Sequence, residues 1–304
     1  MVTNWSETEW QKQLTSLEQI LASGQSIKQA QGVVIIGFGE ISTILQFQQQ
    51  PHWVIKRMPI FDTDEQANRY LQNYLQYTML LREAGLNIPL SSELIIGNNP
   101  VTLYILQTAF PAERIASNAL RTSNFEQQKI ILQQLIQEIE KVFTYNLKYG
   151  NDYLLSCDGQ ASNWAIAGDK IHFIDTSTPL FKKDNLEQLE YDLLLKSTPC
   201  FLRGIIRCFF LDDILERYYK KSQVYIDLIA NLQKEQLGYL IPHAIQLVNP
   251  YLDKQLSEKI VTDYYRQDKI TWQVFLAFRK FDRWMHKYLW HKPYQYILPE
   301  KVHR

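Results

Sequence analysis

The sequence predicts an α+β protein in which a strand-rich N-terminal part precedes a larger, mainly helical part. Short apolar runs between residues 32 and 107 are separated by turns that contain glycine or proline, a pattern typical of β-strands. From Asn124 onward, apolar residues recur mostly at helical spacing. One exception is the pair of apolar segments around Ala167-Gly168-Asp169-Lys170, which predicts a β-hairpin within the helical part.

The N-terminal part is predicted to contain a helix, three strands, a second helix and two strands. Ser6-Glu7-Thr8-Glu9 has the pattern of a capping box. The helix that it opens is expected to continue to Ala22 and to pack onto the sheet, and the alternative is a solvated arm. The remaining elements are expected at residues 32–36, 44–47, 53–58, 62–84, 93–96 and 101–107.

Phe110-Pro111 interrupts both patterns and separates the two predicted parts, residues 1–110 and 111–304. A long amphipathic helix is expected from Asn124 to Tyr149, directly before the hairpin. After the hairpin the pattern predicts helices at about 186–198, 201–219, 222–234, 240–248, 254–266 and 270–291.

Composition narrows the class of protein. The 304 residues are 46% hydrophobic and 13% aromatic, which favours a packed globular chain, and the formal net charge is zero. Neutral charge gives no reason to expect a nucleic-acid partner. The three cysteines, Cys157, Cys200 and Cys208, form no Cys-x-x-Cys pair. With no signal-peptide pattern and no apolar run long enough to span a bilayer, we expect a cytoplasmic protein.

Three polar residues flank the predicted hairpin. Asp158 and Asn163 lie just before it and Asp175 lies just after it, so a folded hairpin returns Asp175 to the neighbourhood of Asn163. Oxygen ligands of this kind suit Mg²⁺. Each residue can instead have a purely structural role, because Asp158 and Asn163 can form local turns and Asp175 can cap a helix.

Two features of the N-terminal part accompany this site. Gly37-Phe38-Gly39 lies between two strands, where glycines either form a turn or let the backbone approach a polyphosphate. Lys56 lies within an apolar strand, where an unpaired ammonium group is costly, although it could face solvent at an edge.

Between Gly32 and Asp175 the chain resembles the protein-kinase-like superfamily, in particular its small-molecule branch of aminoglycoside and choline kinases. Gly37-Phe38-Gly39 is similar to the glycine-rich loop, and Val54-Ile55-Lys56 to the Val-Ala-Ile-Lys strand. The spacing of Asp158 and Asn163 is similar to the Asp-x-x-x-x-Asn catalytic loop, and Ile174-Asp175 to the metal-binding strand end. The resemblance implies a bilobal fold with a small antiparallel-sheet lobe and a helical lobe.

The resemblance also implies a role for each residue. Lys56 would hold the phosphates of ATP or GTP beneath the turn at Gly37-Phe38-Gly39, and Gln107, near the end of the fifth strand, is counted with the nucleotide-binding residues. Asp158 would accept the proton of an attacking hydroxyl. Asn163 and Asp175 would bind Mg²⁺.

The chain departs from the kinase pattern in three places. Ser156-Cys157 stands where the catalytic loop usually has His and Arg, and Thr176-Ser177 follows Asp175 in place of Phe-Gly. The second helix carries no acid between Gln66 and Arg82. The sequence therefore leaves two alternatives for the partner of Lys56, which are Glu65 and a neutral residue such as Gln72 or Tyr74.

The C-terminal helices are expected to form the acceptor site. Arg279, Arg283 and Lys287 recur every four residues among aromatic residues, with Arg203 and Arg207 further upstream. This pattern indicates either a solvated basic face or a site for an anionic acceptor, and the scarcity of carboxylates disfavours an aminoglycoside.

Three functional hypotheses remain open. The sequence favours an ATP- or GTP-dependent, Mg²⁺-dependent phosphotransferase that acts on a small-molecule hydroxyl. The alternative is a pseudokinase-like nucleotide-binding or interaction protein without transfer activity. A kinase for protein or tRNA-linked substrates is disfavoured by the neutral charge and the short segment after Asp175.

Overall fold

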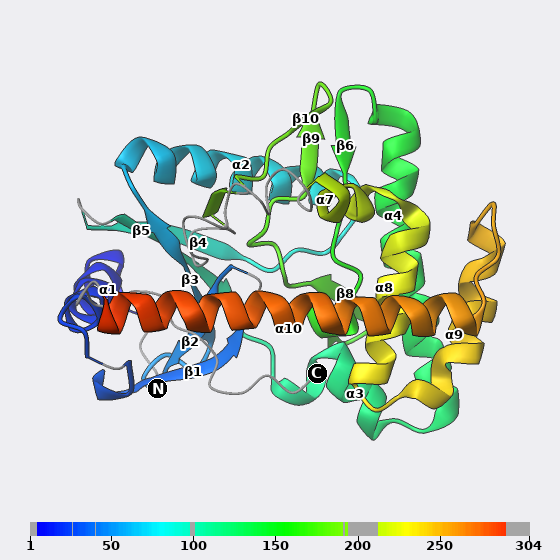
Figure 1. Ribbon diagram of the computed structural model, residues 1–304, viewed down its shortest axis with the longest axis horizontal. Coiled ribbons are helices and arrows are strands. Elements are labelled where there is room, and N and C mark those ends of the chain that lie inside the picture. Colours follow the sequence, from blue (N-terminus) through cyan, green and yellow to red (C-terminus); the bar gives the residue numbers. More distant parts are fainter. Residues whose placement is uncertain are drawn as a thin grey trace.

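The computed structural model describes residues 5–25, 27–39, 41–97, 101–190, 192–193 and 212–289. Its N-terminal part is a five-stranded antiparallel sheet with strand order β1-β2-β3-β5-β4. The strands are β1 (Val33–Phe38), β2 (Thr43–Phe47), β3 (Trp53–Phe61), β4 (Ser91–Ile96) and β5 (Val101–Thr108). Helix α1 (Glu7–Ala22) packs on one face of this sheet, and α2 (Asp64–Glu83) belongs to the core on the other face (Figure 1).

Local signals fix the starts of these helices. The predicted capping box of α1 is present, since Ser6 accepts a hydrogen bond from the amide of Glu9 and the Glu9 carboxylate accepts one from the amide of Ser6. Thr63 caps α2 by accepting from the amide of Gln66 at 3.2 Å. The prediction that α1 packs onto the sheet is confirmed, because Leu14 and Leu17 share a buried cluster with strand residues.

The second part is mainly helical, and a connecting segment after β5 that contains a short 3₁₀ helix, Ala112–Arg114, leads into it. Its first helices are α3 (Ala116–Thr122) and α4 (Phe125–Tyr149). The predicted hairpin follows as β7 (Trp164–Ala167) and β8 (Lys170–Phe173). Gly168 takes φ 64° at its turn, a conformation that glycine adopts without steric cost.

The remaining elements are three short strands and four helices of the described chain. Strands β6 (Tyr153–Leu155), β9 (Phe181–Lys183) and β10 (Leu186–Glu187) form a small antiparallel sheet. The helices are α7 (Asp212–Tyr219), α8 (Lys221–Lys234), α9 (Ile241–Val248) and α10 (Glu258–Tyr288), and α10 crosses the front of the molecule in the view of Figure 1.

The α+β fold class, with an antiparallel N-terminal sheet and a helical C-terminal part, is confirmed. This architecture is consistent with a bilobal, protein-kinase-like fold. Strand boundaries within the sheet agree with the prediction to within a few residues, and α4, α8 and α9 lie where the apolar spacing places them.

Some predicted elements were wrong. The helix expected at 186–198 begins as strand β10, because Leu186 and Glu187 pair with Lys183 and Lys182. The two helices expected at 254–266 and 270–291 are one continuous helix, α10, since no proline or glycine interrupts residues 258–288. Strands β6 and β9 and helix α3 were not predicted. Residues 194–198 of the helix expected at 186–198, and residues 201–211 of the helix expected at 201–219, lie outside the described residues.

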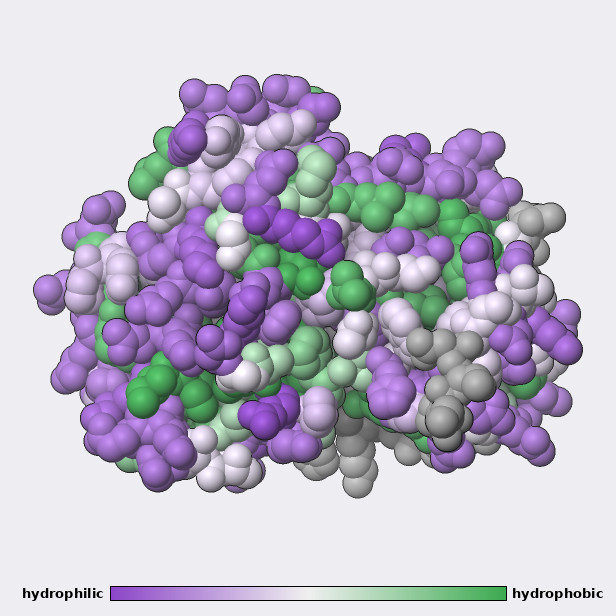
Figure 2. Space-filling view, turned by 180° about the vertical axis from the view of Figure 1, so that it is seen from behind, coloured by the Kyte–Doolittle hydropathy of each residue, from purple (hydrophilic) through white to green (hydrophobic). Residues whose placement is uncertain are grey.

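The face of the molecule opposite to that of Figure 1 is mainly hydrophilic (Figure 2). On the reverse face, hydrophilic residues cover most of the area and hydrophobic residues appear between them in smaller patches (Figure 2). Among the described residues, no helix is both long and apolar enough to cross a bilayer.

Candidate functional site

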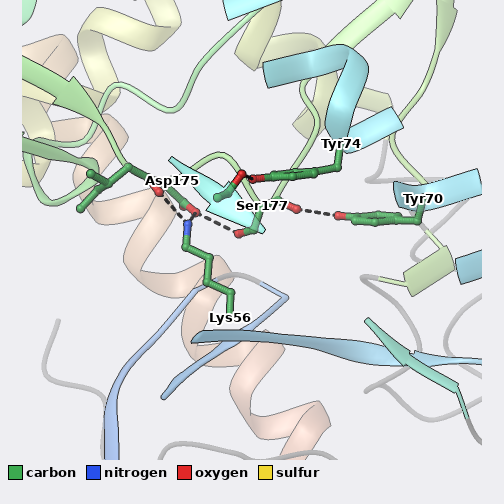
Figure 3. A network of polar contacts seen from close by, with 7 residues as sticks. Lys56, Tyr70, Tyr74, Asp175 and Ser177 are labelled. Atoms are coloured by element: carbon green, nitrogen blue, oxygen red, sulfur yellow. Dashed lines mark hydrogen bonds and ion pairs between the residues drawn. The ribbon is translucent and has the colours of Figure 1, made fainter. Parts of the chain in front are cut away.

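Lys56 lies at the centre of β3 and is 4% exposed. Its ammonium group donates to the Ile174 carbonyl oxygen at 2.6 Å and lies 3.3 Å from Asp175 Oδ1 (Figure 3). Burial lowers the pKa of Lys56, while the charge and hydrogen bond of Asp175 act in the opposite direction. The structure therefore brings together two predicted site residues that are 119 positions apart in the sequence.

The next residue, Arg57, points to the opposite face because side chains alternate along a strand. Its guanidinium group forms two hydrogen bonds with Glu18 of α1, at 2.7 and 2.9 Å, and it is 3% exposed. Tyr104, which pairs with Arg57 across β5 and β3, also donates to Glu18. Helix α1 is thus tied by an ion pair to the strand that carries Lys56.

The hairpin returns Asp175 to Asn163 as predicted. Trp164 pairs with Phe173, and the amide of Ile174 donates to the Asn163 carbonyl oxygen at 2.9 Å. Asp175 Oδ1 accepts a further hydrogen bond from Ser177 Oγ at 3.1 Å. The Asp175 side chain keeps 23% of its surface exposed, so a ligand can reach it.

Asp158 begins the loop that ends at Asn163. It is 8% exposed, and Oδ1 accepts from the Gln160 amide at 3.0 Å while Oδ2 accepts from Gln160 Nε2 at 3.3 Å. Gly159 approaches helix α8 so closely that an added Cβ would lie 3.0 Å from Val224 Cγ1 and 3.1 Å from its carbonyl oxygen. The loop is therefore seated directly on α8.

The glycine turn connects β1 and β2. The amide of Gly39 donates to the Ser42 carbonyl oxygen at 2.9 Å, and a Cβ on Gly39 would meet Ser42 Oγ at 2.7 Å. Gly37 pairs with Ile44, and Ile44 pairs with Lys56. Gly37, Ile44 and Lys56 therefore lie side by side on three neighbouring strands, which connects the turn to Lys56. Phe38, in the same turn, is 40% exposed.

Gln107 lies on the same face of the sheet as Lys56. It pairs with Val54, two residues before Lys56, and its side chain is 3% exposed. Its Nε2 is buried and has no hydrogen-bond partner, which is unusual for a buried amide in a folded protein. Gln107 is therefore a polar group with unused hydrogen-bonding capacity near Lys56.

The partner of Lys56 is neither of the alternatives considered from the sequence. Glu65 and Gln72 are exposed on α2, and the pKa of Glu65 is lowered by hydrogen bonds within its own helix start, to its backbone and Thr63. Tyr74 donates to Ser91 Oγ at 3.0 Å. The acid that faces Lys56 comes from the other part of the chain, as Asp175.

Helix α2 instead presents three buried tyrosines, Tyr70, Tyr74 and Tyr77, each 0% exposed. Burial raises the pKa of Tyr77 well above its usual value, and nearby Cys157, Asp175 and Asp158 raise it further. Charges of two predicted site residues, Asp158 and Asp175, therefore act on the hydroxyl of Tyr77. Sequence reasoning considered Tyr74 only as a partner of Lys56 and missed Tyr70 and Tyr77, although the spacing of four and three residues places all three on one face of the helix.

The residues that replace His and Arg before Asp158 are buried. Ser156 Oγ donates to the Tyr218 carbonyl oxygen at the end of α7. Cys157 is a free thiol, and burial raises its pKa above the ordinary value. Both residues thus support the loop, and neither supplies a positive charge beside Asp158.

The basic residues of α10 do not share one environment. Arg279 is 9% exposed, whereas Arg283 and Lys287 are exposed. Phe281 and Trp284 stack at 5.8 Å between ring centroids and are both partly exposed. Arg203 and Arg207 lie outside the described residues. The described residues hold no group of three or more His, Cys, Asp or Glu side chains that could bind a metal.

The model of a family of unknown function, DUF6206, matches residues 16–283. The chain belongs to this family. No curated protein matches it at a significant level.

Among solved structures, the chain is similar to the GDP and kanamycin complex of APH(2")-IIia. The identity is 10% and the TM-score is 0.32, and the match covers 72% of this chain and 92% of that one.

Proposed function

We infer that the protein is a nucleotide- and Mg²⁺-dependent phosphotransferase that acts on a hydroxyl group of a small molecule. The observation that carries this inference is the contact between buried Lys56 and Asp175 at 3.3 Å, with Asn163 adjacent to Asp175 in the hairpin. A buried lysine beside a carboxylate at a strand end can bind phosphate groups while the carboxylate binds a cation.

The residues can divide the chemistry of phosphoryl transfer among them. Lys56 would bind phosphate oxygens of ATP or GTP, and the turn at Gly37-Phe38-Gly39 would cover them. Asp158, oriented by its two hydrogen bonds from Gln160, would accept the proton of the acceptor hydroxyl. Gln107 would contact the nucleotide with its buried amide. Such a reaction depends mainly on positioning and on charge neutralisation.

The donor set fits a magnesium ion shared with phosphates. Asp175 uses Oδ1 for Lys56 and Ser177, and within the described part of the chain no hydrogen bond engages Oδ2. Asn163 supplies a half-buried amide next to it. Magnesium commonly takes one or two protein oxygen ligands and completes its shell with water and phosphate oxygens. A bound ion would neutralise charge on the transferring phosphoryl group.

A groove of about 450 Å³ between α7, α8 and α10 favours an anionic acceptor. Arg217 and Lys220 line it, and within the described chain their side chains take part in no hydrogen bond or ion pair. The groove also contains Asp263, which is 3.7 Å from Arg266. Its wall is adjacent to the catalytic loop, because Tyr218 contacts Ser156 and Val224 contacts Gly159.

A second candidate function is a nucleotide-binding protein without transfer activity. It is favoured by the absence of an acidic residue on α2 facing Lys56, and by the direct bond from Lys56 to the Ile174 carbonyl. The free thiol of Cys157 and the absence of a disulfide framework from the sequence are compatible with the cytoplasm as its compartment.

The experiment that tests the function combines binding and transfer. Thermal unfolding is followed with ATP or GTP, with and without Mg²⁺, in the wild type and in Asp158→Ala. We expect metal-dependent stabilisation by a nucleotide in both proteins, because Asp158 is not a proposed metal ligand. Phosphate transfer, measured with a panel of neutral and anionic hydroxyl compounds, should fall by about 10²- to 10⁴-fold in Asp158→Ala.

Each outcome decides between the hypotheses. No nucleotide-dependent stabilisation in the presence of Mg²⁺ would rule out both candidate functions. Stabilisation with equal background transfer in wild type and Asp158→Ala would leave the binding protein. Transfer to neutral compounds alone would reject the anionic acceptor and the role of the Arg217–Lys220 groove.

A further inference from the structure

The two carboxylates of the site are connected to α2 through backbone carbonyl groups. Tyr70 donates its hydroxyl hydrogen to the Ser177 carbonyl oxygen at 2.7 Å, and Tyr77 donates to the Ser156 carbonyl oxygen at 2.8 Å. Ser177 is two residues after Asp175, and Ser156 is two residues before Asp158. The two hydroxyls therefore hold both segments that carry the proposed chemistry.

For Asp175 this connection continues through a side chain. Tyr70 holds the Ser177 backbone, and Ser177 Oγ donates to Asp175 Oδ1 at 3.1 Å, beside the ammonium group of Lys56 (Figure 3). Displacement of Ser177 would thus change the orientation of the Asp175 carboxylate. It would also change the contact of Asp175 with Lys56, since both groups use the same oxygen atom.

Both hydroxyls are permanent donors at ordinary pH. Burial is the largest cause that raises the pKa of Tyr70 and of Tyr77 well above the usual value, and nearby carboxylates raise it further. A buried hydrogen bond between a neutral hydroxyl and a carbonyl also excludes water from the carbonyl. The two tyrosines therefore act as fixed attachment points.

We propose that Tyr70 and Tyr77 are positioning residues, which set the orientation of Asp175 and Asp158 from helix α2. In this arrangement α2 acts on the backbone of the catalytic segments and does not supply an acid to Lys56. The proposal rests on the proposed phosphotransferase function for its kinetic consequences. Its structural content, that the two hydroxyls order residues 156–158 and 175–177, is independent of any activity.

The test uses variants that remove one hydroxyl group and keep the ring. Tyr77→Phe should lower kcat about 3- to 10-fold with little change in the KM for nucleotide, because Asp158 acts on the acceptor hydroxyl. Tyr70→Phe should raise the Mg²⁺ concentration needed for half-maximal rate by a similar factor, since it affects Asp175. The double variant should show both effects.

Tyr104→Phe is the matched control. Tyr104 is equally buried, and its hydroxyl bonds Glu18 on the opposite face of the sheet. This variant should lose comparable thermal stability while kcat and the Mg²⁺ requirement stay unchanged. If all three variants lost activity only in proportion to their stability, the positioning role would be rejected and a purely structural role would remain.

A second measurement keeps the proposal separate from the enzymatic function. Hydrogen exchange of the ligand-free protein should show faster exchange within residues 156–160 in Tyr77→Phe and within 175–178 in Tyr70→Phe, but in neither segment for Tyr104→Phe. A wild type without transfer activity would reject the proposed function, and exchange would then decide the positioning role by itself. Unchanged exchange in both segments would overturn the proposal.

Discussion

At the scale of single residues, Lys56 and Asp175 are in contact but are buried to different extents. Lys56 is 4% exposed, whereas the side chain of Asp175 is 23% exposed and has a second oxygen atom that can be hydrated. The lowered pKa of Lys56 indicates that burial disfavours its charge more than Asp175 favours it. Removing one partner or the other should therefore have different effects on stability.

We expect Lys56→Met to leave the free energy of unfolding within about 1 kcal/mol of the wild type, or to increase it. Methionine fills a similar volume, and Asp175 remains partly hydrated. Asp175→Asn should instead lower the free energy of unfolding by about 2–4 kcal/mol, because it leaves the buried ammonium group without its counter-charge. Urea denaturation near neutral pH measures the free energy of unfolding of both variants. Nucleotide binding should be lost in Lys56→Met. Equal destabilisation by the two variants would contradict the unequal burial of this pair.

The sequence was sufficient to predict that Asp175 returns to Asn163, because local structure fixes their spacing. A hairpin with a short turn joins the two positions, and one loop separates Asp158 from Asn163. The partner of Lys56 could not be found in the same way. A search for acids on α2 assumes which helix faces the lysine, whereas the contact with Asp175 depends on how the two parts of the chain pack. The residues assigned to nucleotide and metal binding stay predictions.

At the scale of elements, α1 is held to the sheet by both apolar and charged contacts. Its residues Trp10, Leu14, Leu17 and Leu21 are buried against the sheet, and Glu18 lies between Arg57 and Tyr104. The apolar spacing predicted this packing. The ion pair was not predicted, although strand alternation places Arg57 on the face opposite Lys56, where a buried charge requires a partner.

Glu18→Gln should therefore destabilise the protein by about 3 kcal/mol, because Arg57 would stay charged and buried without a counter-charge. The double variant Glu18→Leu with Arg57→Met should recover much of this loss, since it removes both charges from the interface. Denaturation by urea gives the free energy of unfolding of the single and of the double variant. The exposed pair between Lys129 and Glu126 serves as the control, and Glu126→Gln should change stability by less than about 1 kcal/mol. A loss below about 1 kcal/mol in Glu18→Gln would show that the ion pair does not hold α1.

At the scale of the whole molecule, the larger hydrophobic cluster includes residues of α2, β5, α4, the loop at 156–163 and α8. It passes from the sheet into the helical part, so the relative placement of Lys56 and Asp175 depends on long-range packing. Local patterns predicted the order of the elements. They did not predict β9 and β10, because two or three residues carry too little periodicity to be distinguished from a loop or a helix start.

Buried tyrosines are a property of this whole core, and they predict how stability depends on alkaline pH. The pKa is raised for eight tyrosines, with burial as the largest cause in each: Tyr70, Tyr74, Tyr77, Tyr104, Tyr145, Tyr219, Tyr225 and Tyr264. In the unfolded chain these phenols ionise near pH 10, whereas the folded protein keeps them neutral. The folded state then binds more protons, so stability is fully present below about pH 10 and falls as pH rises above it. Lys56 acts in the opposite direction, because its folded pKa is lowered, but it is a single group.

We therefore expect the free energy of unfolding to fall above about pH 10 by up to about 1.4 kcal/mol per pH unit for each fully buried tyrosine. Urea denaturation at several pH values measures this slope, and tyrosinate absorbance should rise in two steps, with the second step coinciding with unfolding. Tyr225→Phe removes a tyrosine that is 0% exposed and should reduce the slope by the contribution of one group. Tyr288→Phe, which removes the hydroxyl of a tyrosine that is 55% exposed, serves as the matched control. A single absorbance step that is complete before unfolding would show that these phenols are accessible in the folded protein, and that the tyrosine face of α2 is not closed to solvent.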